Sequence, residues 1–245
     1  MSAEHVAIVT GGAQGIGFGI ASRLAHDGMR VAIIDLDGDR AEQAAEQLGV
    51  DGLGLGGDVS NPDEMESAVD VVRQKLGGPT VLVSNAGWSP YKDFLELTHA
   101  EIERVVAVNY TGPLALCRAM LPEMLERGHG RIVFIGSDAG RVGTRNESVY
   151  AGTKAALLGF AKSLAVEVAG GGVTVNVVSP GSTDTALLRG MVDEDGLQKR
   201  LRANPMKRLG TAQDIADTVA FFCGSGASYI TGQVLSVNGG MSRLG

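Results

Sequence analysis

The chain has 245 residues, of which 44% are hydrophobic and 20% are charged, a balance that excludes an intrinsically disordered protein. It carries 21 basic and 28 acidic residues and no basic run long enough to follow a phosphate backbone, which argues against nucleic-acid binding. Two cysteines fit no disulfide framework, and the four histidines never stand at ligand spacing, so no metal site is expected. No apolar stretch is long enough to span a membrane and the first residues lack the pattern of a signal peptide, so the protein is expected to be cytoplasmic.

Short β-branched runs alternate with longer helical patterns along the whole chain. The runs predict strands at 5–10, 30–35, 53–59, 80–85, 130–137, 172–179 and 233–238. The patterns between them predict helices near 15–27, 39–48, 61–76, 99–127, 149–169 and 211–224. Such alternation predicts an α/β fold in a single domain over residues 1–245. The fold is a doubly wound, mostly parallel, seven-stranded sheet of the Rossmann type, with helices on both faces.

Residues 182–210 interrupt this regular alternation. Helix-forming residues here mix with glycine, proline and charge. A long excursion in a compact α/β domain is typical of a binding segment, so we expect a substrate lid. Its basic residues Lys199, Arg200 and Arg202 would either meet a negatively charged substrate or form a solvated helix face.

The first predicted strand runs directly into a glycine-rich turn, T-G-G-A-Q-G-I-G, from Thr10 to Gly17. Glycines at this point allow a tight turn and let the backbone approach a pyrophosphate at a helix N-terminus. The turn does not follow the pattern GxGxxG, and alone it also fits a purely structural turn in a chain with 36 glycines.

An acidic residue at the end of the second strand favours the nucleotide interpretation. Asp35 follows Gly17 by 18 residues, where a carboxylate would accept hydrogen bonds from an adenosine ribose. The same charge would repel a 2′-phosphate, and no arginine replaces it, so NAD is expected rather than NADP. As the alternative, Asp35 would be a loop carboxylate or the cap of a helix that begins near Gly38.

The turn from Thr10 to Gly17 resembles the TGxxxGIG motif of the short-chain dehydrogenase/reductase family. Further motifs of this family recur in the same order along nearly the whole chain. They are Asp58-Val59, Asn85-Ala86-Gly87 (with Ser84 in place of the family's preceding Asn), Asn109, Ser137, Tyr150-Ala151-Gly152-Thr153-Lys154 and Pro180-Gly181.

This resemblance implies the residues that would hold NAD. They are Gly11, Gln14, Gly15, Ile16, Gly17, Asp35, Leu36, Asp58, Val59, Asn85, Ala86, Gly87, Tyr150, Lys154, Pro180, Gly181, Thr183 and Thr185. Either threonine would instead cap the helix of the following segment if it does not contact the coenzyme.

Three polar groups are expected to meet at one edge of the sheet. Tyr150 and Lys154 are four residues apart on a predicted helix, so they share a face. Ser137 closes a strand at the end where open α/β sheets bind ligands. Free tyrosine, with a pKa of ~10, is a poor base near neutrality, and a nearby ammonium group favours the phenolate.

The resemblance implies a role for each of these groups. Tyr150 would be the acid/base of a hydride transfer between an alcohol and a nicotinamide. Lys154 would hold the nicotinamide ribose and lower the pKa of Tyr150. Ser137 would orient the substrate oxygen, and Asn109 would hold a water molecule in a proton relay.

The substrate is less well defined by the sequence. Trp88 would form a wall of the substrate pocket, or it would pack against the protein without a role in binding. Arg141 would bind an acidic group or a coenzyme A phosphate of the substrate, or it would be a solvated loop residue. The stretches SDAGRVG and PGSTDTALL resemble dehydrogenases of alicyclic β-hydroxyacyl-CoA thioesters, of the 2-hydroxycyclohexanecarboxyl-CoA type, and also 3-oxoacyl-carrier-protein reductases. A nucleotide-binding sensor without turnover is the remote alternative. The family further implies a homotetramer.

Overall fold

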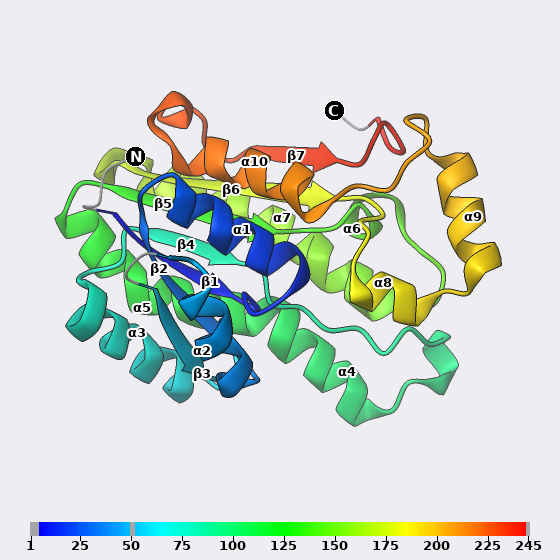
Figure 1. Ribbon diagram of the computed structural model, residues 1–245, viewed down its shortest axis with the longest axis horizontal. Helices are drawn as coiled ribbons and strands as arrows, with labels where there is room; N and C mark the ends of the chain where they lie inside the picture. The colour runs from blue at the N-terminus through cyan, green and yellow to red at the C-terminus, as the bar shows by residue number, and fades with distance from the viewer. Residues whose placement is uncertain (1–4, 50–51, 244–245) are drawn as a thin grey trace.

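The computed structural model describes residues 5–49 and 52–243, and the strands in this part of the chain form one sheet (Figure 1). The strands are β1 (Val6–Thr10), β2 (Arg30–Asp35), β3 (Leu53–Gly56), β4 (Val81–Ser84), β5 (Gly130–Ile135), β6 (Val173–Pro180) and β7 (Val234–Val237). Their order is β3-β2-β1-β4-β5-β6-β7, and each neighbouring pair is parallel. The predicted doubly wound α/β fold is confirmed.

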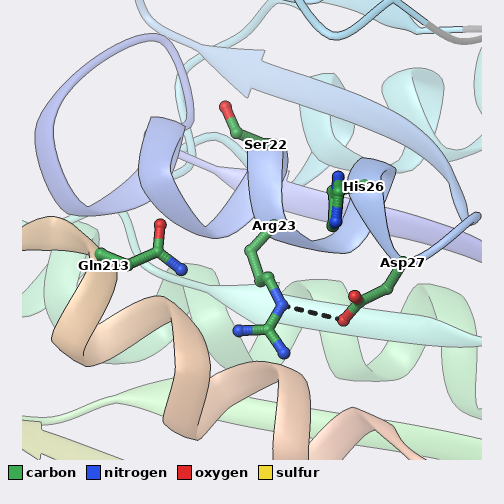
Figure 2. Close-up of a pocket in the computed structure, with 5 residues that line it drawn as sticks. All are labelled: Ser22, Arg23, His26, Asp27 and Gln213. Carbon is green, nitrogen blue, oxygen red and sulfur yellow. Dashed lines mark hydrogen bonds and ion pairs between the residues drawn. The ribbon is translucent and has the colours of Figure 1, made fainter.

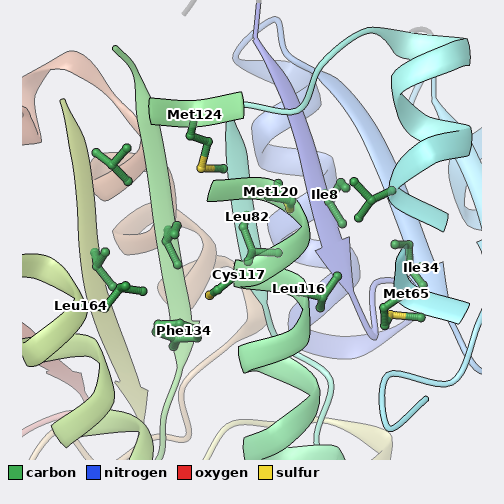
Figure 3. Packing of buried hydrophobic residues seen from close by; sticks show 14 of the residues in the cluster. Ile8, Ile34, Met65, Leu82, Leu116, Cys117, Met120, Met124, Phe134 and Leu164 are labelled. Carbon is green, nitrogen blue, oxygen red and sulfur yellow. The ribbon is translucent and has the colours of Figure 1, made fainter. Parts of the chain in front are cut away.

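Helices cover both faces of the sheet. The side chains of α1 (Gly15–His26), α2 (Gly38–Glu46) and α10 (Ala212–Cys223) share one hydrophobic cluster with one face. Those of α3 (Pro62–Leu76), α5 (Gly112–Glu126) and α7 (Ser148–Val168) share a second cluster with the other face, where Met120 and Leu164 pack against Leu82 and Phe134 (Figure 3). Burial on both faces explains why β1, β4, β5 and β6 are continuous apolar runs rather than alternating ones. No helix in the described ranges is both long and apolar enough to cross a membrane.

Several elements end earlier than the sequence predicts, among them β5, which stops at Ile135, so that Ser137 lies two residues beyond the strand that it was expected to close. The long helix expected at 99–127 is divided into α4 (His99–Val106), a π-helical segment (Ala107–Thr111) and α5. A π segment leaves a carbonyl without its usual partner, and the Asn109 side chain donates to the Val105 carbonyl at 2.9 Å. The third strand stops at Gly56 rather than at residue 59, because the chain turns where Asp58 accepts a hydrogen bond from the Ser60 N–H at 2.9 Å.

The segment 182–210 contains two helices, α8 (Ala186–Met191) and α9 (Glu194–Ala203), which stand beyond the ends toward which the strands point (Figure 1). Its base is closed, because the Asp184 N–H donates to the Gly210 carbonyl at 2.8 Å and the Gly210 N–H donates to the Ser182 carbonyl at 3.0 Å. Neither helix contains a buried residue. The short elements are α6 (Ala139–Val142) and the 3-10 turns Phe94–Glu96, Ala169–Gly171 and Ser225–Ala227.

Candidate active site

The glycine turn leaves the N-terminus of α1 open. Gly11 and Gly15 have φ angles of +59° and +55°, the region that favours glycine. Gln14 makes no side-chain cap for α1, and the first turn contains no acid, whereas Asp37 and Asn61 cap α2 and α3. Free N–H groups at an uncapped helix start fit an anion such as a coenzyme pyrophosphate.

A set of hydrogen bonds fixes this turn to the end of β4. The Asn85 side-chain amide donates to the carbonyls of Thr10 at 3.0 Å and Gly11 at 2.9 Å. The buried Thr10 hydroxyl accepts from the N–H groups of Asn85 and Ala86, both at 3.1 Å. A Cβ on Gly11 would lie 2.9 Å from the Ala86 Cα, so the two backbones approach as closely as glycine allows.

The sequence analysis did not single out Thr10. Its signal was a polar residue at the end of an otherwise apolar strand, directly before the glycines. Gly17 is constrained by the same packing, because its Cβ would lie 2.1 Å from the Gly11 carbonyl oxygen.

Asp35 lies against the glycine turn and does not cap α2. Its carboxylate accepts from the Ala13 N–H at 3.1 Å and from the Asp37 N–H at 3.4 Å, and Leu36 beside it is exposed. The cap of α2 is Asp37, which accepts from the Arg40 N–H at 3.1 Å. The helix-cap alternative for Asp35 is therefore wrong.

Arg40 places a cation beside Gln14 and Asp37, which the sequence analysis missed. Its guanidinium donates to the Gln14 side-chain oxygen at 2.9 Å and lies 3.8 Å from an Asp37 oxygen. Gln14, one of the predicted coenzyme residues, is thus tied to α2.

Asp58, one of the residues expected to hold the coenzyme, has a side chain that is already bound to other residues. Its carboxylate pairs with Arg104 at 2.7 Å and accepts from Ser60. Burial acts to raise the pKa of Asp58, but the hydrogen bonds from Arg104 and Ser60 outweigh it and hold the pKa below its ordinary value. Val59 is buried against Gly112 of α5, so this pair would offer a coenzyme mainly its backbone.

Tyr150, Lys154 and Ser137 meet at the edge of the sheet where β5 ends. Lys154 is only 3% exposed, and its Nζ donates to the Ile135 carbonyl at 2.8 Å and lies 5.6 Å from the centre of the Tyr150 ring. The Ser137 hydroxyl accepts from the Ala139 N–H at 3.1 Å and lies close enough to Tyr150 to act as its hydrogen-bond partner.

Burial moves the pKa values of the two titratable groups in opposite directions. It lowers the pKa of Lys154 to about 8. Burial, followed by the negative charge of Glu147, raises the pKa of Tyr150 to about 12, although Ser137 acts to lower it. The pKa of Tyr150 therefore lies above its ordinary value in the chain by itself, because desolvation of the phenol dominates, and the expected influence of Lys154 stays a prediction.

Asn109 is fully buried and holds the loop that follows β4. Its side-chain oxygen accepts from the Trp88 N–H at 3.1 Å, and its amide donates to the Trp88 carbonyl at 2.7 Å. A Cβ on Gly87 would lie 2.9 Å from the Asn109 oxygen and 3.5 Å from the Lys154 Nζ. Asn109 thus packs beside Lys154, and the Trp88 side chain remains 38% exposed.

The residues after β6 reach back to the glycine turn. Thr185 caps α8 by accepting from the Leu188 N–H at 3.2 Å, as the capping alternative predicted. A Cβ on Gly15 would lie 3.6 Å from the Thr185 methyl group, so Thr185 also faces the turn. Thr183 is buried and donates to the Gly181 carbonyl at 3.1 Å, directly after Pro180 ends β6.

Arg141 points along the sheet edge toward β7. Its guanidinium donates to the Ser236 hydroxyl at 2.7 Å, and Ser236 in turn donates to Asp138 at 2.7 Å. The predicted substrate arginine is therefore part of a polar network between α6 and β7.

A surface hollow of about 600 Å³ lies on the outer side of α1 and α10 (Figure 2). Its lining consists of Ser22, Arg23, His26, Asp27 and Gln213. Arg23 is paired with Asp27 at 3.1 Å and with Asp217, and the hollow includes none of the predicted coenzyme or catalytic residues. It is not the active site.

An open helix N-terminus at the end of β1, with a tyrosine, a buried lysine and a serine at the same sheet edge, is the arrangement of a Rossmann-type oxidoreductase. A family model described as enoyl-(acyl carrier protein) reductase matches residues 11–242. The chain belongs to the short-chain dehydrogenase/reductase family and is an oxidoreductase of this nicotinamide-dependent class.

Several curated relatives match over almost their full length. The 3-oxoacyl-[acyl-carrier-protein] reductase FabG of Escherichia coli (strain K12) is 39% identical over 236 residues, which cover 96% of each chain. The 3-oxoacyl-[acyl-carrier-protein] reductase MabA of Mycobacterium bovis is 39% identical, with 96% of this chain and 91% of MabA covered. The 2-(S)-hydroxypropyl-CoM dehydrogenase 3 of Xanthobacter autotrophicus is 36% identical, with 98% of each chain covered.

Replacing Thr10 tests the attachment of the glycine turn to β4. Thr10→Val leaves the N–H groups of Asn85 and Ala86 without their acceptor, so we expect the free energy of unfolding to fall by about 1–3 kcal/mol. Thr10→Ser keeps the hydroxyl and should lose much less. Urea denaturation measures both variants. A loss in Thr10→Val no larger than that in Thr10→Ser would show that the hydroxyl does not carry the effect, because Thr10→Val keeps the methyl group and Thr10→Ser keeps the hydroxyl.

Proposed function

We propose that the protein is an NAD(H)-dependent dehydrogenase that interconverts a secondary alcohol and its ketone. The observation that carries this proposal is the meeting of Tyr150, Lys154 and Ser137 at the sheet edge that also carries the glycine turn. The bound coenzyme supplies the hydride acceptor or donor.

Each residue of the proposed site would have a separate role in the reaction. In reduction, the Tyr150 hydroxyl gives its proton to the substrate oxygen while the carbonyl carbon receives the hydride. Ser137 orients that oxygen through its hydroxyl. Lys154 keeps one N–H on the Ile135 carbonyl and has further N–H groups for a ribose hydroxyl. The side chain of Asn109 is already hydrogen-bonded to Trp88 and Val105. This favours a role in positioning the residues beside Lys154 over a role in binding a water molecule.

The substrate class we favour is a cyclic or acyl-CoA-linked β-hydroxy compound. The names of FabG and MabA, and the motifs SDAGRVG and PGSTDTALL, support a thioester-linked β-oxo or β-hydroxy group. A 3-oxoacyl-carrier-protein reductase is the second candidate, favoured by the 39% identity to FabG. A sensor without turnover does not account for the presence of Tyr150, Lys154 and Ser137 together.

We also propose a homotetramer in the cytoplasm. Leu95, Val166 and Tyr229 are large apolar side chains that are almost fully exposed in the single chain, which is typical of surfaces covered by further copies. Light scattering on the purified protein measures this, and a monomer would contradict it.

The first activity test concerns the phenol. Tyr150→Phe should lower kcat by about 10²–10⁴-fold, because the proton-transfer group is lost. The affinity for NADH, measured by fluorescence, should remain nearly unchanged, since the glycine turn and Asp35 hold the nucleotide. A Phe variant with the rate of the unsubstituted protein would remove Tyr150 from this role.

Coenzyme choice is expected to follow from Asp35. The unsubstituted protein should prefer NAD to NADP in kcat/KM by about tenfold or more, because a carboxylate repels a 2′-phosphate at close range. Asp35→Ala combined with Leu36→Arg should relax this preference. Equal kcat/KM values for the two coenzymes in the unsubstituted protein would contradict the assignment of NAD.

The segment 182–210 should behave as a substrate lid. Helices α8 and α9 bury no residue, so little apolar contact holds them in the free protein. Hydrogen exchange should be fast in both helices in the free protein and slower with coenzyme and substrate. Strong protection in both states would mean that the segment is fixed.

A further inference from the structure

Asp138 directly follows Ser137 and is bound to the ends of two neighbouring strands. It stands at the N-cap of α6, but its side chain makes no cap hydrogen bond there. Its N–H donates to the Pro180 carbonyl at the end of β6 at 3.2 Å, and one of its carboxylate oxygens accepts from the Ser236 hydroxyl of β7 at 2.7 Å. Asp138 is 9% exposed, so a buried carboxylate after β5 is held by the next two strands of the sheet.

The other carboxylate oxygen of Asp138 binds the segment that follows β7, residues 238–242. It accepts from the Asn238 side-chain amide and from the Ser242 hydroxyl, the latter at 2.7 Å. The Asn238 amide also donates to the Ser242 hydroxyl at 2.8 Å, so these three side chains bind one another. A carboxylate has only acceptor sites, and those of Asp138 receive three side-chain donors from β7 and the segment 238–242.

The segment 238–242 is itself fixed to the rest of the protein. Asn204, at the end of α9, is 3% exposed and donates its side-chain amide to the Asn238 carbonyl at 3.0 Å. A Cβ on Gly239 would lie 2.5 Å from the Asn204 side-chain oxygen, so the two parts of the chain pack closely. The segment therefore gives the Asp138 carboxylate a fixed anchor.

The Ser137 hydroxyl belongs to the turn that Asp138 holds. It accepts from the Ala139 N–H at 3.1 Å, and the Ser137 carbonyl accepts from the Gly140 N–H at 3.0 Å. The same turn packs against α7, because a Cβ on Gly140 would lie 2.8 Å from the Ala155 backbone nitrogen. The direction of the Ser137 hydroxyl is therefore set by a turn with two attachments, one to α7 and one through the Asp138 carboxylate.

We propose that Asp138 is a positioning residue that holds the Ser137 hydroxyl toward the substrate oxygen, with the segment 238–242 as its anchor. The inference rests on the proposed function, in which Ser137 orients that oxygen. Without the Asp138 carboxylate the turn would lose its attachment to β7 and to the anchor, and a misplacement of about an ångström at a reacting centre costs up to about 10²-fold in rate. The glycine turn follows β1, which is separated from β5 by β4, so coenzyme binding should depend little on this carboxylate.

The first test is a double-mutant cycle on kcat/KM for the NAD-dependent oxidation of 3-hydroxybutyryl-CoA and 2-hydroxycyclohexanecarboxyl-CoA. Asp138→Asn keeps the shape of the side chain but places an amide nitrogen where an oxygen accepts, opposite other donors. It should lower kcat/KM by about tenfold or more. In the Ser137→Ala background the same substitution should change kcat/KM by less than about twofold, because Asp138 acts through the Ser137 hydroxyl.

An exchange of two side chains is the second test. Asn238→Asp alone removes a donor to Asp138 and places two carboxylates together, so it should also lower kcat/KM. Asp138→Asn combined with Asn238→Asp restores one amide and one carboxylate in the reverse order. The combined variant should return kcat/KM to within about threefold of the unsubstituted protein.

Glu123→Gln on α5 is the matched control. Its carboxylate also accepts three N–H groups, from Arg73 at 2.9 Å and from Arg127 at 3.1 and 2.8 Å, and the net charge changes by the same amount. Glu123 lies against Gly78, which precedes β4, at the edge of the sheet opposite to the site. Like Asp138→Asn, it should lower the free energy of unfolding in urea, but it should leave kcat/KM within about twofold. The NADH affinity, measured by fluorescence, should be unchanged in both variants.

Two results would overturn the inference and leave the proposed function standing. One is a folded Asp138→Asn variant with unchanged kcat/KM. The other is an equal loss from Asp138→Asn with and without the Ser137 hydroxyl, which would show that Asp138 does not act through Ser137. If Ser137→Ala is too slow to measure, the exchange decides, and a combined variant as slow as the single variants overturns the inference.

If Asp138→Asn does not fold, Ser242→Ala carries the test, since it removes one donor to the carboxylate. It should lower kcat/KM by about threefold, and an unchanged value overturns the inference. Ser137→Ala with the activity of the unsubstituted protein, or no oxidation of either probe by the unsubstituted protein, would contradict the proposed function itself, and this inference with it.

Discussion

The amide of Asn85, which bridges the carbonyls of Thr10 and Gly11, is the contact on which both halves of the site depend. It joins the ends of β1 and β4, and it sets the position from which α1 starts. Two residues later, Gly87 lies against Asn109 and Lys154 so closely that a Cβ would not fit beside the Asn109 oxygen. The nucleotide turn and the proton-transfer groups are therefore held in one register by the three residues Asn85–Gly87. A displacement of these three residues by about an ångström would therefore move both the glycine turn and the groups around Lys154.

The same burial that makes this corner rigid also opposes charge on its two titratable groups. Burial lowers the pKa of Lys154 to about 8, and the Ile135 carbonyl accepts one of its N–H groups. The phenol of Tyr150 has only Ser137 to favour its ionised form and stays neutral. In the proposed mechanism the neutral phenol is the form that donates a proton, which favours reduction.

Much of this arrangement could be predicted from the sequence, and the exceptions have physical causes. The order of strands and helices follows from apolar runs and periodicity, and the motif residues around Tyr150 and Ser137 do come together. The break at Asn109 could not be predicted, because it depends on a side chain that binds a helix carbonyl in three dimensions. The rise in the Tyr150 pKa was missed for a similar reason, since spacing reports a neighbouring ammonium group but not the loss of water. Arg141 likewise lies near the expected edge, but its partner Ser236 is 95 residues away in the chain.

The coenzyme end of the site shows why charge preference depends on packing as well as on a motif. Asp35 is fixed against the turn by the Ala13 N–H, whereas the nearby Arg40 is bound to Gln14 and lies close to Asp37. Asp35 binds the backbone of the turn at Ala13, whereas Arg40 binds the side chain of the turn residue Gln14. For Arg40 to neutralise a 2′-phosphate, its guanidinium would have to leave Gln14 and the Asp37 carboxylate. The proposed preference for NAD therefore rests on the Asp35 carboxylate, which the Ala13 N–H holds against the turn, and on the existing contacts of Arg40 with Gln14 and Asp37.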